Sequence, residues 1–239
     1  MSTKPPGEQS RAIAYCEKLK HLAVANNDGY VTIRVVDMDD VFASKEGSLD
    51  KVKKTLFKTL KKLEWIEVMA YSPCTKYLAI GSHDNKIYLY GTKTYSKAHK
   101  LNGHSSFITG LDWSLDSKYL RSVCGAYELL FFNVEKKKHD PSGASNTVET
   151  IWADHTAKFG WNVQGIFPSG CDGSHINSVA LSKDQSLIAT GDDFGLLCMY
   201  RNPCLADHES VKYRGHSEHV TKVKFSECGK YVFSAGGQD

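Results

Sequence analysis

Residues 77–90 read YLAIGSHDNKIYLY, in which two apolar runs flank a polar turn at Asp84. Two runs rich in β-branched and aromatic residues around such a turn predict a β-hairpin. The pattern returns as HLAVANNDGYVTIR from His21, YLRSVCGAYELLFF from Tyr119, SLIATGDDFGLLCMY from Ser186 and YVFSAGGQD from Tyr231. The sequence therefore predicts a fold built from a repeated hairpin unit.

Another strand-like segment precedes most of these hairpins, as in WIEVMAYSPCTK, FITGLDWSLDSK, INSVALSKDQS and VTKVKFSECGK. Successive hairpins are 56, 42, 68 and 44 residues apart, measured between Leu22, Leu78, Leu120, Ile188 and Val232. Two of these intervals match the ~40–45-residue period of WD blades, which are four-stranded antiparallel sheets that pack on their neighbours. We predict an all-β fold, an incomplete WD40-type β-propeller of about four to five blades.

The lengths of the intervals define the expected domain organisation. We expect blades at about residues 12–63, 64–102, 103–153, 176–214 and 215–239, the last one truncated. An insertion is expected at 154–175 and a disordered polar tail at 1–11. Open blades would expose a strand edge and an apolar face. We therefore expect the remaining blades to come from a longer chain or another subunit.

Composition and charge argue against several classes of partner. The chain has 41% hydrophobic and 24% charged residues, ordinary values for a folded soluble protein. A formal net charge of +3 gives no reason to expect a nucleic-acid partner. The apolar runs are too short for a membrane helix, and the first residues form no secretory signal. Seven cysteines without regular spacing indicate reduced thiols in the cytoplasm.

Gly-His pairs at His104 and His216 each open a blade, as in WD repeats. We expect each histidine to make a buried hydrogen bond that ties the loop opening the blade to the hairpin turn. Asp28 and Asp84 stand at the accepting turn position, and Ser82 matches the usual strand hydroxyl. The blades are atypical, because the tryptophan of the WD pair is replaced by Arg34, Tyr90, Phe132 and Tyr200.

Two kinds of site chemistry fit the residues poorly. Cys198, Cys204 and His208 do not follow the paired-cysteine spacing of zinc sites, and Cys198 lies in an alternating strand where burial is expected. Ser105 and Ser217 follow the two blade-opening histidines, but neither stands in the G-x-S-x-G turn of a serine nucleophile. We expect no enzyme activity, no metal and no cofactor.

The segment KVKKTLFKTLKKL, residues 51–63, is strongly basic and can attract an acidic partner. Its leucine spacing also fits a short amphipathic helix. A propeller needs the outer strand of its first blade here, and we favour that strand. In either case the expected partner-binding lysines are Lys51, Lys53, Lys54, Lys58, Lys61 and Lys62.

The insertion at 154–175 is longer than a connection between blades requires, and long loops on rigid scaffolds often carry function. It contains Phe159, Trp161 and Phe167, large side chains of the kind that anchor protein interfaces. Alternatively, these aromatic side chains pack back and cover a gap between blades. The sequence leaves both interpretations open.

Several stretches resemble one family more closely than they resemble WD repeats in general. They include KYLAIGSHDNKIYLY, GHSSFITGLDWSLDSKYLRSVCGAYELLFF and GHSEHVTKVKF. The most specific are the GDDFG turn at Gly191–Gly195 and FGWNVQGIFP at Phe159–Pro168. In this order they resemble the C-terminal propeller of echinoderm microtubule-associated protein-like proteins, over about residues 12–239.

The resemblance implies a non-enzymatic, microtubule-associated scaffold that binds tubulin, microtubules or other cytoskeletal proteins. It implies a place in the cytoplasm and cytoskeleton and, in ciliated cells, at the axoneme. The family's coiled coil, basic region and first propeller are not found in this sequence. A generic WD40 adaptor for a multiprotein complex is the alternative, because propellers serve many unrelated roles.

Overall fold

Antiparallel β-strands are the main elements of the computed structural model, which describes residues 10–37, 56–60, 63–167, 170, 175–205 and 209–237. The chain divides into two compact units, Met1–Ile151 and Trp152–Asp239.

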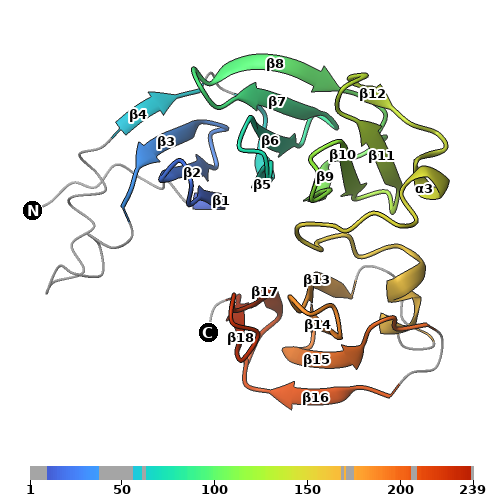
Figure 1. Cartoon of the computed structure of the whole chain (residues 1–239). Helices are drawn as coiled ribbons and strands as arrows, with labels where there is room; N and C mark the ends of the chain where they lie inside the picture. The colour runs from blue at the N-terminus through green and yellow to red at the C-terminus, as the bar shows by residue number, and fades with distance from the viewer. Residues whose placement is uncertain are drawn as a thin grey trace, which may run out of the picture. The chain divides into compact units, whose positions relative to one another are not determined.

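Unit 1 contains three four-stranded sheets, and in each sheet neighbouring strands follow chain order. The first sheet has β1 (Ser10–Cys16), β2 (His21–Asn26), β3 (Val31–Val35) and β4 (Leu56–Thr59). The second has β5 (Ile66–Tyr71), β6 (Tyr77–Ser82), β7 (Ile87–Gly91) and β8 (Ser96–Leu101). The third has β9 (Ile108–Trp113), β10 (Tyr119–Cys124), β11 (Leu129–Asn133) and β12 (Lys138–His139), followed by the short helix α3 (Gly143–Asn146). Strands β1, β5 and β9 lie on the inner side of this arc of sheets, and β4, β8 and β12 lie on the outer side (Figure 1).

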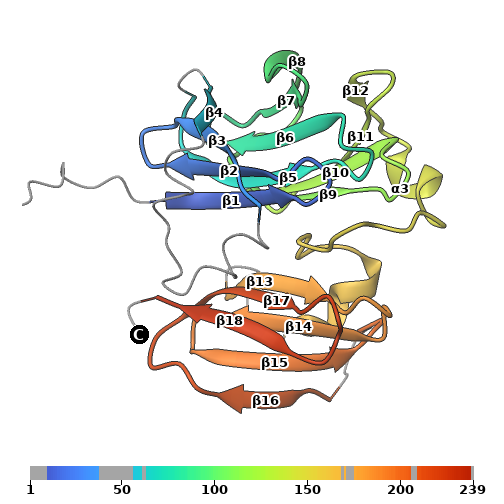
Figure 2. The same cartoon turned by 60° about the vertical axis from the view of Figure 1, so that its left-hand side comes forward.

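Unit 2 begins with the insertion, which contains the 3₁₀ helix η1 (Trp161–Ile166). A four-stranded sheet follows, with β13 (Ile176–Leu181), β14 (Leu187–Asp192), β15 (Leu196–Arg201) and β16 (Val211–Arg214). The last pair, β17 (Val220–Phe225) and β18 (Val232–Gly236), forms a two-stranded sheet beside it (Figure 2). The predicted all-β fold with four-stranded antiparallel sheets is confirmed.

The predicted hairpins share one turn geometry. In four of them, a residue one or two positions before the third strand has a positive φ: Gly29 (78°), Asn85 (64°), Tyr127 (63°) and Gly195 (75°). Glycine and asparagine adopt this left-handed conformation readily, and it is the one that hairpin turns with a bulge require. The turn therefore explains why a small or polar residue recurs at this point of the repeat. Tyr127 adopts the same conformation despite its bulk.

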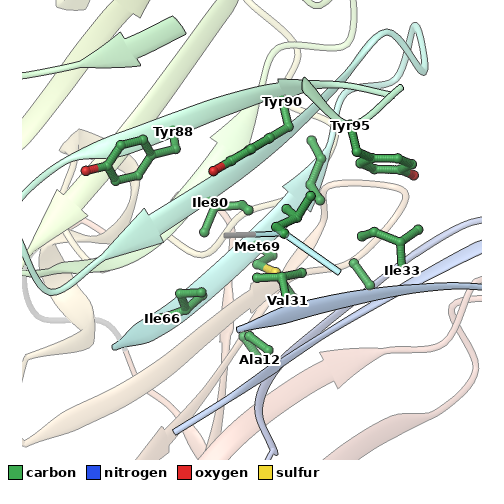
Figure 3. Close-up of a cluster of buried hydrophobic side chains, with 13 residues drawn as sticks. Ala12, Val31, Ile33, Ile66, Met69, Ile80, Tyr88, Tyr90 and Tyr95 are labelled. Carbon is green, nitrogen blue, oxygen red and sulfur yellow. The ribbon is translucent and has the colours of Figure 1, made fainter. Parts of the chain in front are cut away.

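The middle sheet of unit 1 buries both of its faces, because alternate residues of its strands point in opposite directions. Leu78 and Ile80 belong to a cluster shared with the first sheet, whereas Ala79 belongs to a cluster shared with the third. Figure 3 shows the first cluster, in which Val31 and Ile33 lie with residues of the middle sheet. Burial on two faces explains why strands such as IYLY are apolar at every position.

A one-residue register shift recurs where the first strand of each repeat pairs with the second. Such a β-bulge leaves one residue outside the ladder and re-aims its side chain. The residues left out of the pairing are Arg11, Glu67, Thr109, Asn177 and Thr221. The five repeats therefore share a β-bulge at the same place, although the residues at the bulge differ.

The limits of the expected blades stay predictions. Strand β1 begins at Ser10, inside the range 1–11 that was expected to be a disordered tail. Residues 1–9, and residues 38–55 in the first long interval, lie outside the described residues. In the described part of the chain, no helix is long and apolar enough to cross a membrane.

Candidate partner-binding site

Only one lysine of the basic segment lies in the described part of the chain. Lys58 belongs to β4, is half-buried, and donates a hydrogen bond from Nζ to the carbonyl oxygen of Thr94. Strand β4 pairs with β3, so the alternative of an amphipathic helix is wrong for residues 56–59. The remaining predicted lysines lie outside the described residues: Lys51, Lys53, Lys54, Lys61 and Lys62.

The insertion packs against the sheet that follows it. Val163 and Ile166 of η1 are fully buried and join a hydrophobic cluster with residues of β13, β14 and β15. The backbone N–H of Gly165 donates to Cys204 O at 2.8 Å. A Cβ at Gly165 would lie 1.6 Å from the carbonyl oxygen of Leu205, so only glycine allows this close approach. The helix is therefore fixed to the sheet through both its backbone and its side chains.

The three predicted aromatic side chains of the insertion do not share one environment. Phe159 and Phe167 stack with ring centroids 5.9 Å apart, and Phe167 packs against the cluster that contains Ile166. Trp161, at the first position of η1, is 62% exposed. The structure thus packs Phe167 back onto the sheet and leaves the side chain of Trp161 largely exposed.

His104 lies at the centre of a hydrogen-bonded network in the third sheet of unit 1. Its imidazole is buried; Nε2 lies 2.6 Å from Ser122 Oγ in β10, and Nδ1 lies 3.3 Å from Glu128 Oε2. Glu128 also accepts hydrogen bonds from the backbone N–H and the hydroxyl of Ser105. The network connects the loop before β9 with β10 and with the turn that leads into β11.

The donors around Glu128 control its ionisation. The backbone N–H of Ser105 and the thiol of Cys124 stabilise the carboxylate and lower the pKa of Glu128 to about 2. Burial lowers the pKa of His104 despite the neighbouring carboxylate. The imidazole is therefore held in its neutral form beside an ionised carboxylate.

The second blade-opening histidine makes the equivalent contact. His216 Nε2 lies 2.8 Å from Ser234 Oγ, and in both pairs the serine follows the histidine by 18 residues. Ser122, Ser234 and Glu128 were missed in the sequence analysis. The equal spacing was the available signal for the two serines, whereas Glu128 lies two residues beyond the expected acidic turn position.

The other predicted signature residues lie elsewhere. Asp28 is exposed in the β2–β3 turn. Asp84 Oδ2 accepts hydrogen bonds from Tyr88 Oη at 2.6 Å and Lys86 Nζ at 3.2 Å, rather than from a blade-opening histidine. Although burial raises it, the bond from Tyr88 holds the pKa of Asp84 below its usual value. Ser82 is buried at the end of β6, two repeat positions beyond the place that corresponds to Ser122.

Potential metal ligands converge at one place in the described chain. Donor atoms of His104, Cys124 and Glu128 lie within 4.8 Å of one another, and Cys124 Sγ donates to Glu128 Oε2 at 3.1 Å. Hydrogen bonding within the network accounts for these groups. Cys198 and Cys204 are buried in the cluster beneath η1, whereas His208 lies outside the described residues.

Repeated four-stranded antiparallel sheets, side-by-side packing of inner strands and a blade-opening histidine bonded to a strand hydroxyl define a WD-type β-propeller protein. A solved structure of this class, described as "Crystal Structure of Mitotic Checkpoint Complex", superposes with a TM-score of 0.54 and covers 94% of this chain and 57% of that chain. The identity is 14%, so this likeness supports the fold alone.

The family model described as "Echinoderm microtubule-associated protein second beta-propeller" matches residues 2–239. The chain belongs to this family. It is 53% identical to "Ciliary WD repeat-containing protein ctxp80" of Euplotoides octocarinatus over 92% of this chain and 29% of that protein. It is 44% identical to "77 kDa echinoderm microtubule-associated protein" of Lytechinus variegatus over 72% of this chain and 27% of that protein.

The match extends to "Echinoderm microtubule-associated protein-like 1" of Homo sapiens, with 42% identity over 74% of this chain and 22% of that protein. The chain thus spans less than a third of the length of the curated relatives it matches. The predicted family and WD40 β-propeller class are confirmed.

Proposed function

We propose that the chain is part of a non-enzymatic scaffold that binds tubulin, microtubules or microtubule-bound proteins. The observation that carries this proposal is the match of the second-propeller family model to residues 2–239. The names of the relatives support it, since they describe microtubule-associated and ciliary WD-repeat proteins. By extension, we propose a location on the cytoskeleton in the cytoplasm and, in ciliated cells, at the axoneme.

Multivalent binding through surface side chains is the mechanism we propose. Packed sheets hold the loops of each unit in fixed positions, so several weak surface contacts add to one another. The basic segment at 51–63 would supply attraction to an acidic surface, and Trp161 would supply an exposed apolar anchor.

Co-sedimentation with microtubules tests the proposed role of the basic segment through matched charge reversals. Lys51, Lys53 and Lys54 are replaced by Glu, and Lys58 is kept because its ammonium group binds Thr94. We expect binding at low salt to weaken by about tenfold, equivalent to ~1.4 kcal/mol. The control reverses the same number of exposed charges, at Lys136 and Lys137 in the β11–β12 turn and at Lys138 in β12.

Equal loss of binding in the two variants would mean that only net charge matters and would remove the basic segment from the proposal. Unchanged binding in both would favour the generic adaptor, which reaches the cytoskeleton through another protein or serves a different complex.

A further inference from the structure

A row of ring side chains crosses from the second to the third sheet of unit 1. Trp65 precedes β5, His83 lies in the β6–β7 turn, and Phe107 precedes β9; we call these three residues the aromatic row. The ring centroids of Trp65 and His83 are 5.6 Å apart, and those of His83 and Phe107 are 4.6 Å apart and stacked. Trp65 is 49% exposed and Phe107 is 38% exposed. The row therefore presents contiguous aromatic surface to solvent.

Equivalent backbone contacts hold the outer members of the row in place. The carbonyl oxygen of Trp65 accepts from His83 N at 2.7 Å, and that of Phe107 accepts from Gly125 N at 2.9 Å. A Cβ at Gly125 would lie 2.7 Å from Phe107 Cε1, so glycine leaves the space that this ring occupies. The members of the row lie outside the strands, and these contacts fix its two outer members in place.

Two β-bulges bring opposite charges to one end of the row. Arg11 and Glu67 are the residues left out of the strand pairing in their sheets. The Arg11 guanidinium carbon lies 4.6 Å from the Trp65 ring centroid, and Nη1 lies 2.9 Å from Glu67 Oε2. The same carboxylate oxygen lies 3.3 Å from His83 Nε2. The row thus already binds one guanidinium group of its own chain, through a ring face and a carboxylate together.

Acidic residues adjoin the row: Glu67 contacts His83, Glu64 precedes Trp65 in the chain, and Glu128 bonds Ser105, two residues before Phe107. Glu64 is exposed, and the side chains of Glu67 and Glu128 are 37% and 34% exposed. Arg11 forms an ion pair with Glu67. A planar guanidinium stacks on aromatic rings and pairs with carboxylates better than a lysine ammonium group does. The chemistry of this surface therefore complements arginine more closely than lysine.

We propose that the aromatic row, together with Glu64 and Glu67, is a docking surface for an arginine-bearing segment of a partner protein. The partner's guanidinium groups stack on the exposed rings of Trp65 and Phe107 and pair with the neighbouring carboxylates. This inference goes beyond the proposed function, because an acidic microtubule surface and an arginine-rich segment are ligands of opposite charge.

Fluorescence anisotropy with labelled peptides tests the inference on the full chain. One probe is a Gly-Arg repeat peptide, and the second has Lys in place of each Arg. We expect the arginine peptide to bind at least about tenfold more tightly than the lysine peptide. The double variant Trp65→Ser, Phe107→Ser should weaken binding of the arginine peptide by about tenfold or more. The variant Glu67→Gln keeps the size of the side chain and should weaken binding as well.

Tyr213→Ser supplies the matched control, since Tyr213 is an aromatic residue of the outer strand β16 and is 53% exposed. This control should bind the arginine peptide as the wild type does, and circular dichroism establishes that each variant is folded. Equal affinity for the two peptides would overturn the inference. Unchanged affinity in both folded row variants, the double variant and Glu67→Gln, would overturn it too.

Discussion

His104 and His216 make the same contact in different surroundings. The His104–Ser122 pair is buried, whereas Ser234, the partner of His216, is exposed. A buried polar atom that loses its hydrogen-bond partner cannot recover the lost free energy from water, whereas an exposed one can. The two pairs therefore separate the effect of burial from the effect of the bond itself.

Replacing Ser122 with Ala should lower the free energy of unfolding by about 1–3 kcal/mol, because it leaves the buried Nε2 of His104 unpaired. Ser234→Ala deletes the equivalent hydroxyl at the exposed site and should change it by less than ~0.5 kcal/mol. Urea unfolding followed by circular dichroism measures both. Equal losses in the two variants would show that burial does not set the strength of this contact.

Acid should destabilise the protein through the same network. The pKa of Glu128 is about 2, below its ordinary value of 4.5, so the unfolded chain binds more protons between these values. The contribution of Glu128 is therefore present above about pH 4.5 and is lost as the pH falls toward about 2. The lowered pKa of His104 acts in the same direction below about pH 6.5.

The variant Glu128→Gln removes the group that titrates. Its stability deficit relative to the wild type should shrink between about pH 5 and about pH 3, because the wild type loses its advantage over that range. Urea midpoints at a series of pH values give the deficit directly. A deficit that stays constant across the series would show that ionisation of Glu128 does not stabilise this sheet.

The sequence predicted which histidines matter but not what they bind. A Gly-His pair is a local signal, whereas Ser122 and Ser234 become partners only when the loop folds over the second strand of the sheet. Ser82 was a plausible strand hydroxyl by local pattern. The structure places the hydroxyl that bonds the histidine two positions earlier in the repeat, on the same face of the strand.

At the scale of single elements, helix η1 combines a buried face with one exposed ring. Ile166 is fully buried against the following sheet, and Trp161 is 62% exposed at the start of the helix. This separation answers part of the question that the sequence left open. The helix packs back onto the sheet, and its one aromatic residue, Trp161, stays largely exposed.

Ile166→Ala should lower the free energy of unfolding of unit 2 by about 2–4 kcal/mol, because it opens a cavity beneath η1. Trp161→Ala should change that free energy by less than ~0.5 kcal/mol and should weaken microtubule binding instead. Urea unfolding and co-sedimentation of both variants provide the comparison. A large loss of stability in Trp161→Ala would assign Trp161 to the core and remove it from the proposed interface.

Inner and outer strands differed in how well the sequence predicted them. The middle hairpins were predicted because their strands are apolar on two faces, as β7 is throughout its first four residues. The outer strand β16 is exposed at every position although its sequence VKYR alternates, and β12 has only two residues, so neither shows a buried face. The aromatic row was missed for a different reason, because its members meet only when two sheets pack side by side.

At the scale of the whole molecule, the repeats share backbone features that their sequences do not show. The same register shift recurs in sheets whose sequences differ, and a residue with positive φ recurs at the same position of the turn. A repeat architecture conserves the backbone contacts that neighbouring sheets share, and its surface positions are free to vary. We therefore assign the proposed binding properties to individual surfaces such as the aromatic row and the exposed end of η1.

Microtubule co-sedimentation of the full-length protein across a salt series tests whether the proposed scaffold binds microtubules directly. We expect the protein to pellet with microtubules at low salt and to pellet less as the salt concentration rises, because salt screens the attraction between exposed charges. A folded protein that fails to pellet even at low salt would contradict direct microtubule binding.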